Sequence, residues 1–339
     1  MSALPPHPVP APSGSADATD AGGSPFGYET PRPARPTRLV VSLAWGNLAL
    51  QLLIILTGGL VRLTGSGLGC STWPQCEPGQ FSPVLHEAAS YHPFVEFGNR
   101  AVSVIVCLVA VGLLVAVWTS PGTRERRPVR LLAIAPLAGV LAQAVIGGIT
   151  VLVELPPAVV GFHFLISAVL VWVSTLLLVR LREGDAPPRQ TFAAAGWSGA
   201  WLRWAPATFA VLTALVVVLG ILTTGAGPHS GDEEVGYRFA LDPAHLAKSH
   251  AMAVWAFVAA VLLTLWLIAR AVPGGTSLAP VRHARRAWGV LVVVTLAQGL
   301  IGYAQYFSGL PVPLVALHLV GSGLLVAAVT AAVLSLRVR

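Results

Sequence analysis

The chain carries very little charge for its length. Charged residues make up only 10% of its 339 residues, whereas a soluble protein carries about a quarter. Hydrophobic residues make up 55%, and the mean hydropathy is +0.74. This composition excludes an ordinary soluble domain and predicts a polytopic membrane protein.

Cysteine is also scarce, with three in the chain. There is no Cys-x-x-Cys-His, which excludes haem attached covalently through that motif. Cys107 falls inside an apolar run and is most simply a small core residue. Cys70 and Cys76 stand close together in a segment predicted to face outside the cytoplasm, where a disulfide can form and persist. We favour a disulfide; the alternative is a metal site, although no histidine stands beside the pair at finger-like spacing.

Large apolar side chains are almost absent from residues 1–36, which are rich in Pro, Ala, Ser and Gly. Such a segment cannot bury enough apolar surface to fold, so we expect a disordered cytoplasmic tail. It has no apolar core and no small-residue cleavage site of its own. We therefore expect no signal peptide here, and the first span serves as an uncleaved anchor.

Long apolar runs account for most of the remaining chain. A membrane-spanning helix needs about 20 mostly apolar residues, and eight runs meet that length. They lie near residues 39–61, 94–118, 131–153, 158–180, 204–223, 246–269, 287–307 and 313–336. The sequence therefore predicts an all-α fold with eight spans.

The basic residues show which side of these spans faces the cytoplasm. Most of the 21 lie in the N-terminal tail, in the second, fourth and sixth loops, and at the C-terminal end. The positive-inside rule places that side in the cytoplasm, with both termini there. The net charge of +7 follows from these short clusters at helix ends, so it gives no argument for nucleic-acid binding.

Two stretches of the chain resemble each other and organise the prediction. Gln143-Ala-Val-Ile-Gly147 precedes His163, and Gln298-Gly-Leu-Ile-Gly302 precedes His318, with 20 residues from glutamine to histidine in both. Because each half has an even number of spans, the halves have the same orientation and form parallel repeats. We predict two four-helix bundles, residues 37–185 and 186–339.

Four polar residues share one depth in the even-numbered spans. Asn99, His163, His250 and His318 each lie about five residues into their span, near its outer end. A lone histidine in a span is often only a hydrogen-bonded structural residue. The duplicated placement instead favours His250 and His318 as two axial ligands of one haem, because imidazole is the usual haem ligand and a porphyrin fits between apolar helices.

The first half differs, because its pairing position holds Asn99, a poorer iron ligand than imidazole. His163 then faces an open side, as a substrate site requires. Glu96 lies one turn earlier and could act as a base or stabilise a developing cation; an ion pair with Arg100 at i, i+4 is the alternative. Arg62 and Arg100 are candidates to pair with haem propionates or simply to cap helices.

Several short motifs together resemble those of the haem A synthase family. They are Leu63-Thr-Gly-Ser-Gly-Leu-Gly-Cys70, Trp73-Pro-x-Cys76, Glu96-x-x-x-Arg100, and the histidines of the fourth, sixth and eighth spans. The resemblance covers about residues 38–336. It implies a multi-pass protein of the bacterial cell membrane that oxidises the C8 methyl of haem O to a formyl group, giving haem A for terminal oxidases.

The resemblance also implies roles for individual residues. His250 and His318 would ligate haem B as cofactor, His163 would ligate the substrate haem, Glu96 would be the catalytic carboxylate, and Cys70 and Cys76 would form a disulfide. Many members have Glu-x-x-His in the second span, where this chain has Glu96-Phe-Gly-Asn99. A second histidine ligand to the substrate haem is therefore not expected from that position.

A non-enzymatic function is the main alternative: a di-haem electron-transfer protein, or a haem carrier. It predicts equivalent haems in both halves, against which Asn99 argues. A transporter is a weaker alternative, because all four polar positions lie near one face. Expected partners are haem O and membrane lipid but not nucleic acid; a haem O synthase, oxidase assembly factors and a second copy of the chain stay open.

Overall fold

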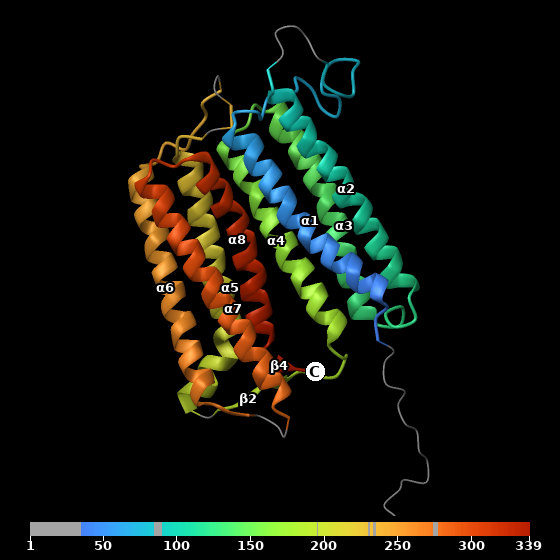
Figure 1. The fold of residues 1–339 in the computed structure, drawn as a ribbon, viewed down its shortest axis with the longest axis vertical. Coiled ribbons are helices and arrows are strands. Elements are labelled where there is room, and N and C mark those ends of the chain that lie inside the picture. The colour runs from blue at the N-terminus through green and yellow to red at the C-terminus, as the bar shows by residue number, and fades with distance from the viewer. Residues whose placement is uncertain (1–34, 85–89, 195, 230, 233–234, 274–276) are drawn as a thin grey trace, which may run out of the picture. The chain divides into compact units, whose positions relative to one another are not determined.

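The computed structural model describes residues 35–339 apart from 85–89, 195, 230, 233–234 and 274–276. Nearly all of the predicted tail, residues 1–36, lies outside the described residues. Within the described part, eight apolar helices are long enough to cross a membrane, which confirms the predicted all-α, eight-span fold. They are α1 (Arg38–Leu63), α2 (His92–Thr119), α3 (Arg127–Leu152), α4 (Pro157–Arg182), α5 (Gly196–Ala226), α6 (Pro243–Arg270), α7 (Ala279–Phe307) and α8 (Val312–Leu334) (Figure 1).

Two helices begin well before the apolar runs predicted from the sequence. Helix α5 begins at Gly196 and α7 at Ala279, whereas the apolar runs begin near residues 204 and 287. The additional turns contain tryptophan and arginine, with Trp197 and Trp204 exposed in α5. Such residues favour the membrane–water interface, so these helices continue beyond the apolar layer, where hydropathy does not detect them.

The helices pack as two sets of four neighbours (Figure 1). Helices α1 to α4 contribute nearly all of one buried apolar cluster, to which Val326 of α8 is added. Helices α5 to α8 form a second cluster around Phe209, Phe257 and Trp288. Helix α8 also packs against α1 and α4, so the two sets share one continuous interface.

The repeat recognised in the sequence extends to the backbone. Leu155, between α3 and α4, and Leu310, between α7 and α8, both have a positive φ, of 59° and 61°. Each donates its backbone N–H to a carbonyl five residues earlier, that of Thr150 or Gln305. The two hairpins therefore turn in the same way, and this places their histidines in equivalent positions.

Proline fixes where the even-numbered helices begin. Each has a proline in its first two positions: Pro93 in α2, Pro157 in α4, Pro243 in α6 and Pro313 in α8. Proline suits the start of a helix because its φ is already helical and it lacks an N–H that would have no partner there. The polar side chains Asn99, His163, His250 and His318, less than two turns later, consequently lie at a common depth.

The opposite end of the molecule is tied together by short strands. β1 (Arg189–Gln190) pairs antiparallel with β4 (Arg337–Val338), and β2 (Phe192–Ala193) pairs antiparallel with β3 (Val272–Pro273). Because β1 lies in the connection between α4 and α5, the C-terminal end of the chain is fixed to the junction of the two helix sets.

An ion-pair network reinforces that end. Arg126 donates to both carboxylate oxygens of Asp185, at 2.8 and 3.0 Å, and to the backbone carbonyl of Glu183 at 2.6 Å. Arg180 pairs with Glu183 at 3.0 Å. The hydrogen bonds from Arg126 hold the pKa of Asp185 below its usual value.

Candidate functional site

Four polar side chains lie at matching positions on the even-numbered helices. Asn99 and His250 lie seven residues after the first residue of α2 and α6, and His163 and His318 lie six residues after the first residue of α4 and α8. At about 1.5 Å per residue, all four are roughly 10 Å along their helix. The structure thus gives them the common depth expected from the sequence.

Each of these side chains faces a glycine on the preceding helix. A methyl group on the glycine would contact the polar side chain, closely at the three histidines and at an ordinary van der Waals distance at Asn99. The distances to that methyl group are 3.4 Å for Gly147 with Cε1 of His163, 3.3 Å for Gly220 with Cε1 of His250, 3.2 Å for Gly302 with Cε1 of His318 and 3.8 Å for Gly58 with Oδ1 of Asn99.

The repeated glutamines hold the histidine-bearing helices. The Nε2 atom of Gln143 donates to the backbone carbonyl of His163 at 3.0 Å, and that of Gln298 donates to the carbonyl of His318 at 3.1 Å. These two bonds explain the constant spacing of 20 residues from glutamine to histidine. They fix the backbone from which each imidazole projects.

The imidazoles are arranged to offer one nitrogen each. Their Nδ1 atoms are buried and make no hydrogen bond; the backbone of Val216 lies near the His250 ring but outside hydrogen-bond geometry. In the part of the chain that the structure describes, no Nε2 atom of His163, His250 or His318 has a hydrogen-bond partner or is fully buried. An accessible, unpartnered Nε2 is the nitrogen through which imidazole commonly binds iron.

Two of the imidazoles belong to one set of helices. His250 and His318 lie close enough to interact electrostatically. Among the described residues no group of three or more His, Cys, Asp or Glu side chains forms a metal cluster. Two imidazole nitrogens with no further ligand are too few for a zinc site, whereas imidazole is the usual ligand of haem iron.

Asn99 occupies the corresponding place in helices α1 to α4 and has a different environment. The hydroxyl of Thr57 donates to its Oδ1 at 2.7 Å. Its backbone carbonyl accepts a bond from Ser103 at 3.0 Å. His163 therefore has an amide, and not a second imidazole, as its counterpart.

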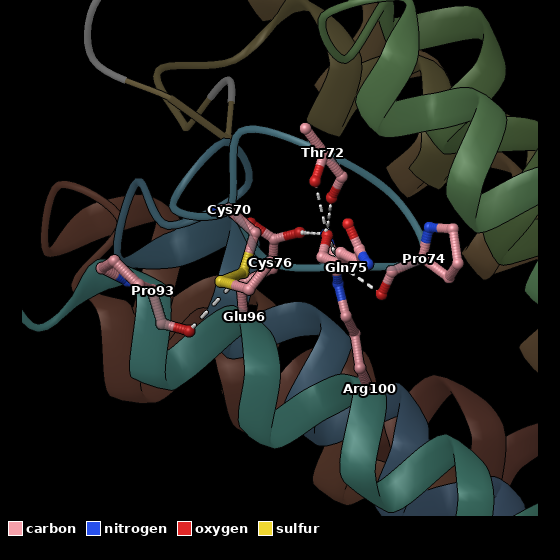
Figure 2. The surroundings of a disulfide bond; sticks show 8 residues. All are labelled: Cys70, Thr72, Pro74, Gln75, Cys76, Pro93, Glu96 and Arg100. Atoms are coloured by element: carbon pink, nitrogen blue, oxygen red, sulfur yellow. Dashed lines mark hydrogen bonds and ion pairs between the residues drawn. A yellow bond between two sulfur atoms is a disulfide. The ribbon is translucent and has the colours of Figure 1, made fainter. Parts of the chain in front are cut away.

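The loop between α1 and α2 is closed by the Cys70–Cys76 disulfide. This confirms the favoured pairing and excludes the alternative of a metal site on two free thiolates. Glu96 lies beneath the loop in α2 and is only 4% exposed (Figure 2). Its Oε2 accepts the backbone N–H of Cys70 at 2.7 Å, and its Oε1 pairs with Arg100 at 2.5 Å.

Arg100 extends this anchor across the rest of the loop (Figure 2). Its guanidinium donates to the backbone carbonyls of Pro74, Gln75 and Thr72 at 3.2, 3.0 and 3.0 Å. A neutral loop is thereby held through its carbonyls by a buried ion pair. The Glu96–Arg100 pair considered as an alternative from the sequence is present, and both carboxylate oxygens are engaged.

Trp73 packs the loop against the neighbouring helix α3. Its indole lies against Gly148, where a methyl group would be only 2.6 Å from Cδ2 of the ring. The adjacent Gly147 faces His163, so the loop contacts the same turn of α3 that borders the imidazole. The disulfide loop therefore covers the outer end of the Asn99–His163 region.

Arg62 lies at the end of α1 and bonds to backbone carbonyls of a distant segment of the chain. Its guanidinium donates to the backbone carbonyls of His229 and Thr224, both at 2.9 Å. It therefore ties the end of α1 to the end of α5 and the connection that follows. The site residues grouped by the structure around α2 are Glu96, Asn99 and Arg100, whereas Arg62 connects the two helix sets.

Sequence reasoning missed Thr57, Trp73 and the facing glycines. Gly147 and Gly302 did carry a signal, because each ends a repeated motif and precedes its histidine by 16 residues. Thr57 carried none, since threonine is an ordinary residue in a membrane helix. Its pairing with Asn99, 42 residues away, depends on how α1 packs on α2.

Comparison with known proteins identifies the family of this chain. A family model described as cytochrome oxidase assembly protein matches residues 42–330. The chain belongs to this family. Since it also has eight membrane-spanning helices and bacterial relatives, it is a multi-pass bacterial membrane protein.

The curated relatives that the chain matches include several haem A synthases. Those of an Exiguobacterium species, Shouchella clausii and Symbiobacterium thermophilum are 33%, 32% and 35% identical over 136, 143 and 182 residues. These stretches cover 40%, 42% and 53% of this chain and 43%, 45% and 56% of the relatives. The chain thus matches about half the length of these relatives, and they confirm the family resemblance found in the sequence.

Proposed function

We propose that the protein is a haem A synthase, which oxidises the C8 methyl group of haem O to a formyl group. Membership of the cytochrome oxidase assembly protein family and the names of its relatives support this activity. The observation that carries the proposal is the inequality of the two helix sets. One has two imidazoles at the common depth, and the other has one imidazole and one amide at that depth, with a disulfide-closed loop over the outer end of α2.

His250 and His318 are the residues we assign to haem B. Each offers an accessible Nε2 at the same depth, and Gly220 and Gly302 give their rings free space. When bound, haem B supplies one-electron redox chemistry. If His250 and His318 both held its iron, they would leave no place on that iron for a substrate.

His163 is the residue we assign to the substrate haem. It has no imidazole opposite, so the space on the side of Asn99 is left for reaction. Conversion of a methyl to a formyl group adds one oxygen atom and passes electrons to an external acceptor, and such a reaction requires an open region beside the methyl group. The disulfide loop, with Trp73 against Gly148, separates the outer end of this region from water.

Glu96 is the residue we assign to catalysis, as a fixed negative charge. Its two oxygens are held by Arg100 and by the N–H of Cys70, so the carboxylate cannot turn freely to take a proton. A carboxylate fixed in a buried place can stabilise positive charge developing on the substrate methyl carbon. Its second effect is to position the loop through Cys70.

The proposal is tested by separating these two effects of Glu96. In cells that make haem O, Glu96→Ala should abolish haem A formation while haem B remains bound to the purified protein. Extracted pigments are measured by chromatography. Glu96→Gln keeps an acceptor for Cys70 but lacks the charge, so it should retain the loop and still lose most activity.

Two outcomes would contradict the proposal. Normal haem A production by Glu96→Ala would remove the catalytic role of that residue. Two equivalent, redox-active haems with no converted porphyrin would instead support the electron-transfer alternative, and a colourless protein would exclude every haem function.

Orientation and partners form part of the same proposal. The arginine-rich end, where β1 pairs with β4, would face the cytoplasm, and the disulfide loop would face outward, where a disulfide persists. Haem O would be received within the membrane. Labelling of a single cysteine introduced at exposed Arg124 by a membrane-impermeant reagent would test the orientation, with labelling of intact cells as the contradicting result.

A further inference from the structure

We propose that Thr57 and Asn99 form a ligand pocket opposite His163, in which the Asn99 amide donates hydrogen bonds to a small exogenous ligand on the substrate haem. This inference rests on the proposed function, because it needs a haem on His163. It concerns the side chain that completes that site. This side chain is Asn99, at the position where the other three helix hairpins carry a histidine.

The first argument is positional. Asn99 faces Gly58 as the three histidines face Gly147, Gly220 and Gly302, and it lies at the same depth in its helix. The amide therefore occupies the place from which an imidazole projects in the other hairpins. Its side chain is shorter than imidazole and is a poor iron ligand, so the corresponding side of the haem keeps space for a small molecule.

The second argument concerns the orientation of the amide. Thr57 donates its hydroxyl hydrogen to Oδ1 at 2.7 Å, which commits the oxygen end to helix α1. Among the described residues, Nδ2 makes no hydrogen bond and is not fully buried. An asparagine amide has two N–H donors on this atom, so the end left available can only donate.

Together these contacts determine which kind of small ligand the pocket would bind. A pair of N–H donors that is unbonded and not fully buried favours a small ligand with a lone pair or negative charge. Cyanide and carbon monoxide have this character and bind haem iron that has one protein ligand. Thr57 does not contact the small ligand. It is a positioning residue that determines which end of the Asn99 amide is presented to that ligand.

The test uses the purified full-length protein reconstituted with haem O and haem B. Cyanide titration of the ferric form and carbon monoxide binding by the ferrous form are followed by absorption spectroscopy. The wild type should contain one ligand-reactive haem. Asn99→His should convert it to a low-spin haem that no longer binds either ligand, because the added imidazole takes the open position.

Two further variants examine the hydrogen bonds. Asn99→Leu and Thr57→Val should weaken cyanide binding on the order of tenfold, the effect of losing one hydrogen bond to a charged group. Thr57→Ser keeps the hydroxyl and should bind cyanide with the wild-type affinity. Thr223→Val is the matched control, because the Thr223 hydroxyl bonds only to a carbonyl of its own helix, that of Leu219.

The outcomes distinguish this inference from the proposed function. If the protein binds both haems but neither reacts with cyanide or carbon monoxide, the pocket is disproved while the synthase proposal stands. Unchanged cyanide affinity in both Asn99→Leu and Thr57→Val would also disprove it. Failure to bind haem O at all would overturn the proposed function itself.

Discussion

The helix sets α1–α4 and α5–α8 share one hairpin design but differ at one polar position and in one loop. In both, proline starts the even-numbered helix, a glycine faces the polar residue, and the last hairpin is held by a glutamine on a backbone carbonyl. They differ at Asn99 against His250 and in the disulfide loop above α2. Under the proposed function, the two sets would differ in role through one ligand position and one loop.

The largest expected effect comes from the imidazoles themselves. His250→Ala should lower bound haem B by at least about tenfold, since it removes one of two axial ligands, whereas His163→Ala should leave haem B unchanged. Haem B per chain is measured after extraction from purified protein. Equal loss in both variants would mean that the two sets do not hold different haems.

The next largest effect, on haem A formation, is expected from the disulfide loop, which only the helix set α1–α4 contains. Arg100→Lys keeps the charge but loses the planar group that reaches three carbonyls, so haem A formation should fall on the order of tenfold while haem B is retained. Pigment analysis of membranes measures both. Arg124→Lys, in an exposed ion pair, is the matched control and should match the wild type. Normal haem A formation with Arg100→Lys would show that the loop needs no such anchor.

The same comparison shows what the sequence could predict. Hydropathy located all eight helices, because a span must be long and apolar whatever it packs against. The shared depth of Asn99, His163, His250 and His318 was also predictable, since it depends only on counting from the start of each apolar run. The early starts of α5 and α7 were not, because polar turns at the interface lack an apolar signal.

Contacts between distant segments could not be predicted from spacing. The Glu96–Arg100 pair was predictable because residues at i and i+4 meet on any helix. The bonds of Glu96 to Cys70 and of Thr57 to Asn99 depend on loop closure and on helix packing. For the same reason the bonds of Arg62 to carbonyls more than 160 residues away in the chain could not be predicted from spacing.

A smaller effect is expected from the facing glycines. Gly302→Ala would place a methyl group 3.2 Å from His318, so the ring must shift and the haem B absorption band should move, with binding weakened severalfold. Gly58→Ala has 3.8 Å to Asn99 and should leave both sites unchanged. Gly299→Ala, one turn from Gly302 in open space, is the control. Equal spectra for all three would show that these contacts do not position the rings.

The smallest effect, on the free energy of unfolding, should come from the Arg126–Asp185 ion pair at the end where the short strands lie. Because Arg126 lowers the pKa of Asp185, the pair stabilises the fold at neutral pH, and this contribution is lost as the pH falls below about 3.9 through the lowered pKa. Asp185 is 37% exposed, so Asp185→Asn should cost less than about 1 kcal/mol of unfolding free energy at pH 7 and nothing at low pH. Thermal unfolding at both pH values measures this, with exposed Glu125→Gln as the control. A selective loss of one haem in Asp185→Asn would contradict the view that the difference between the sets is confined to their outer ends.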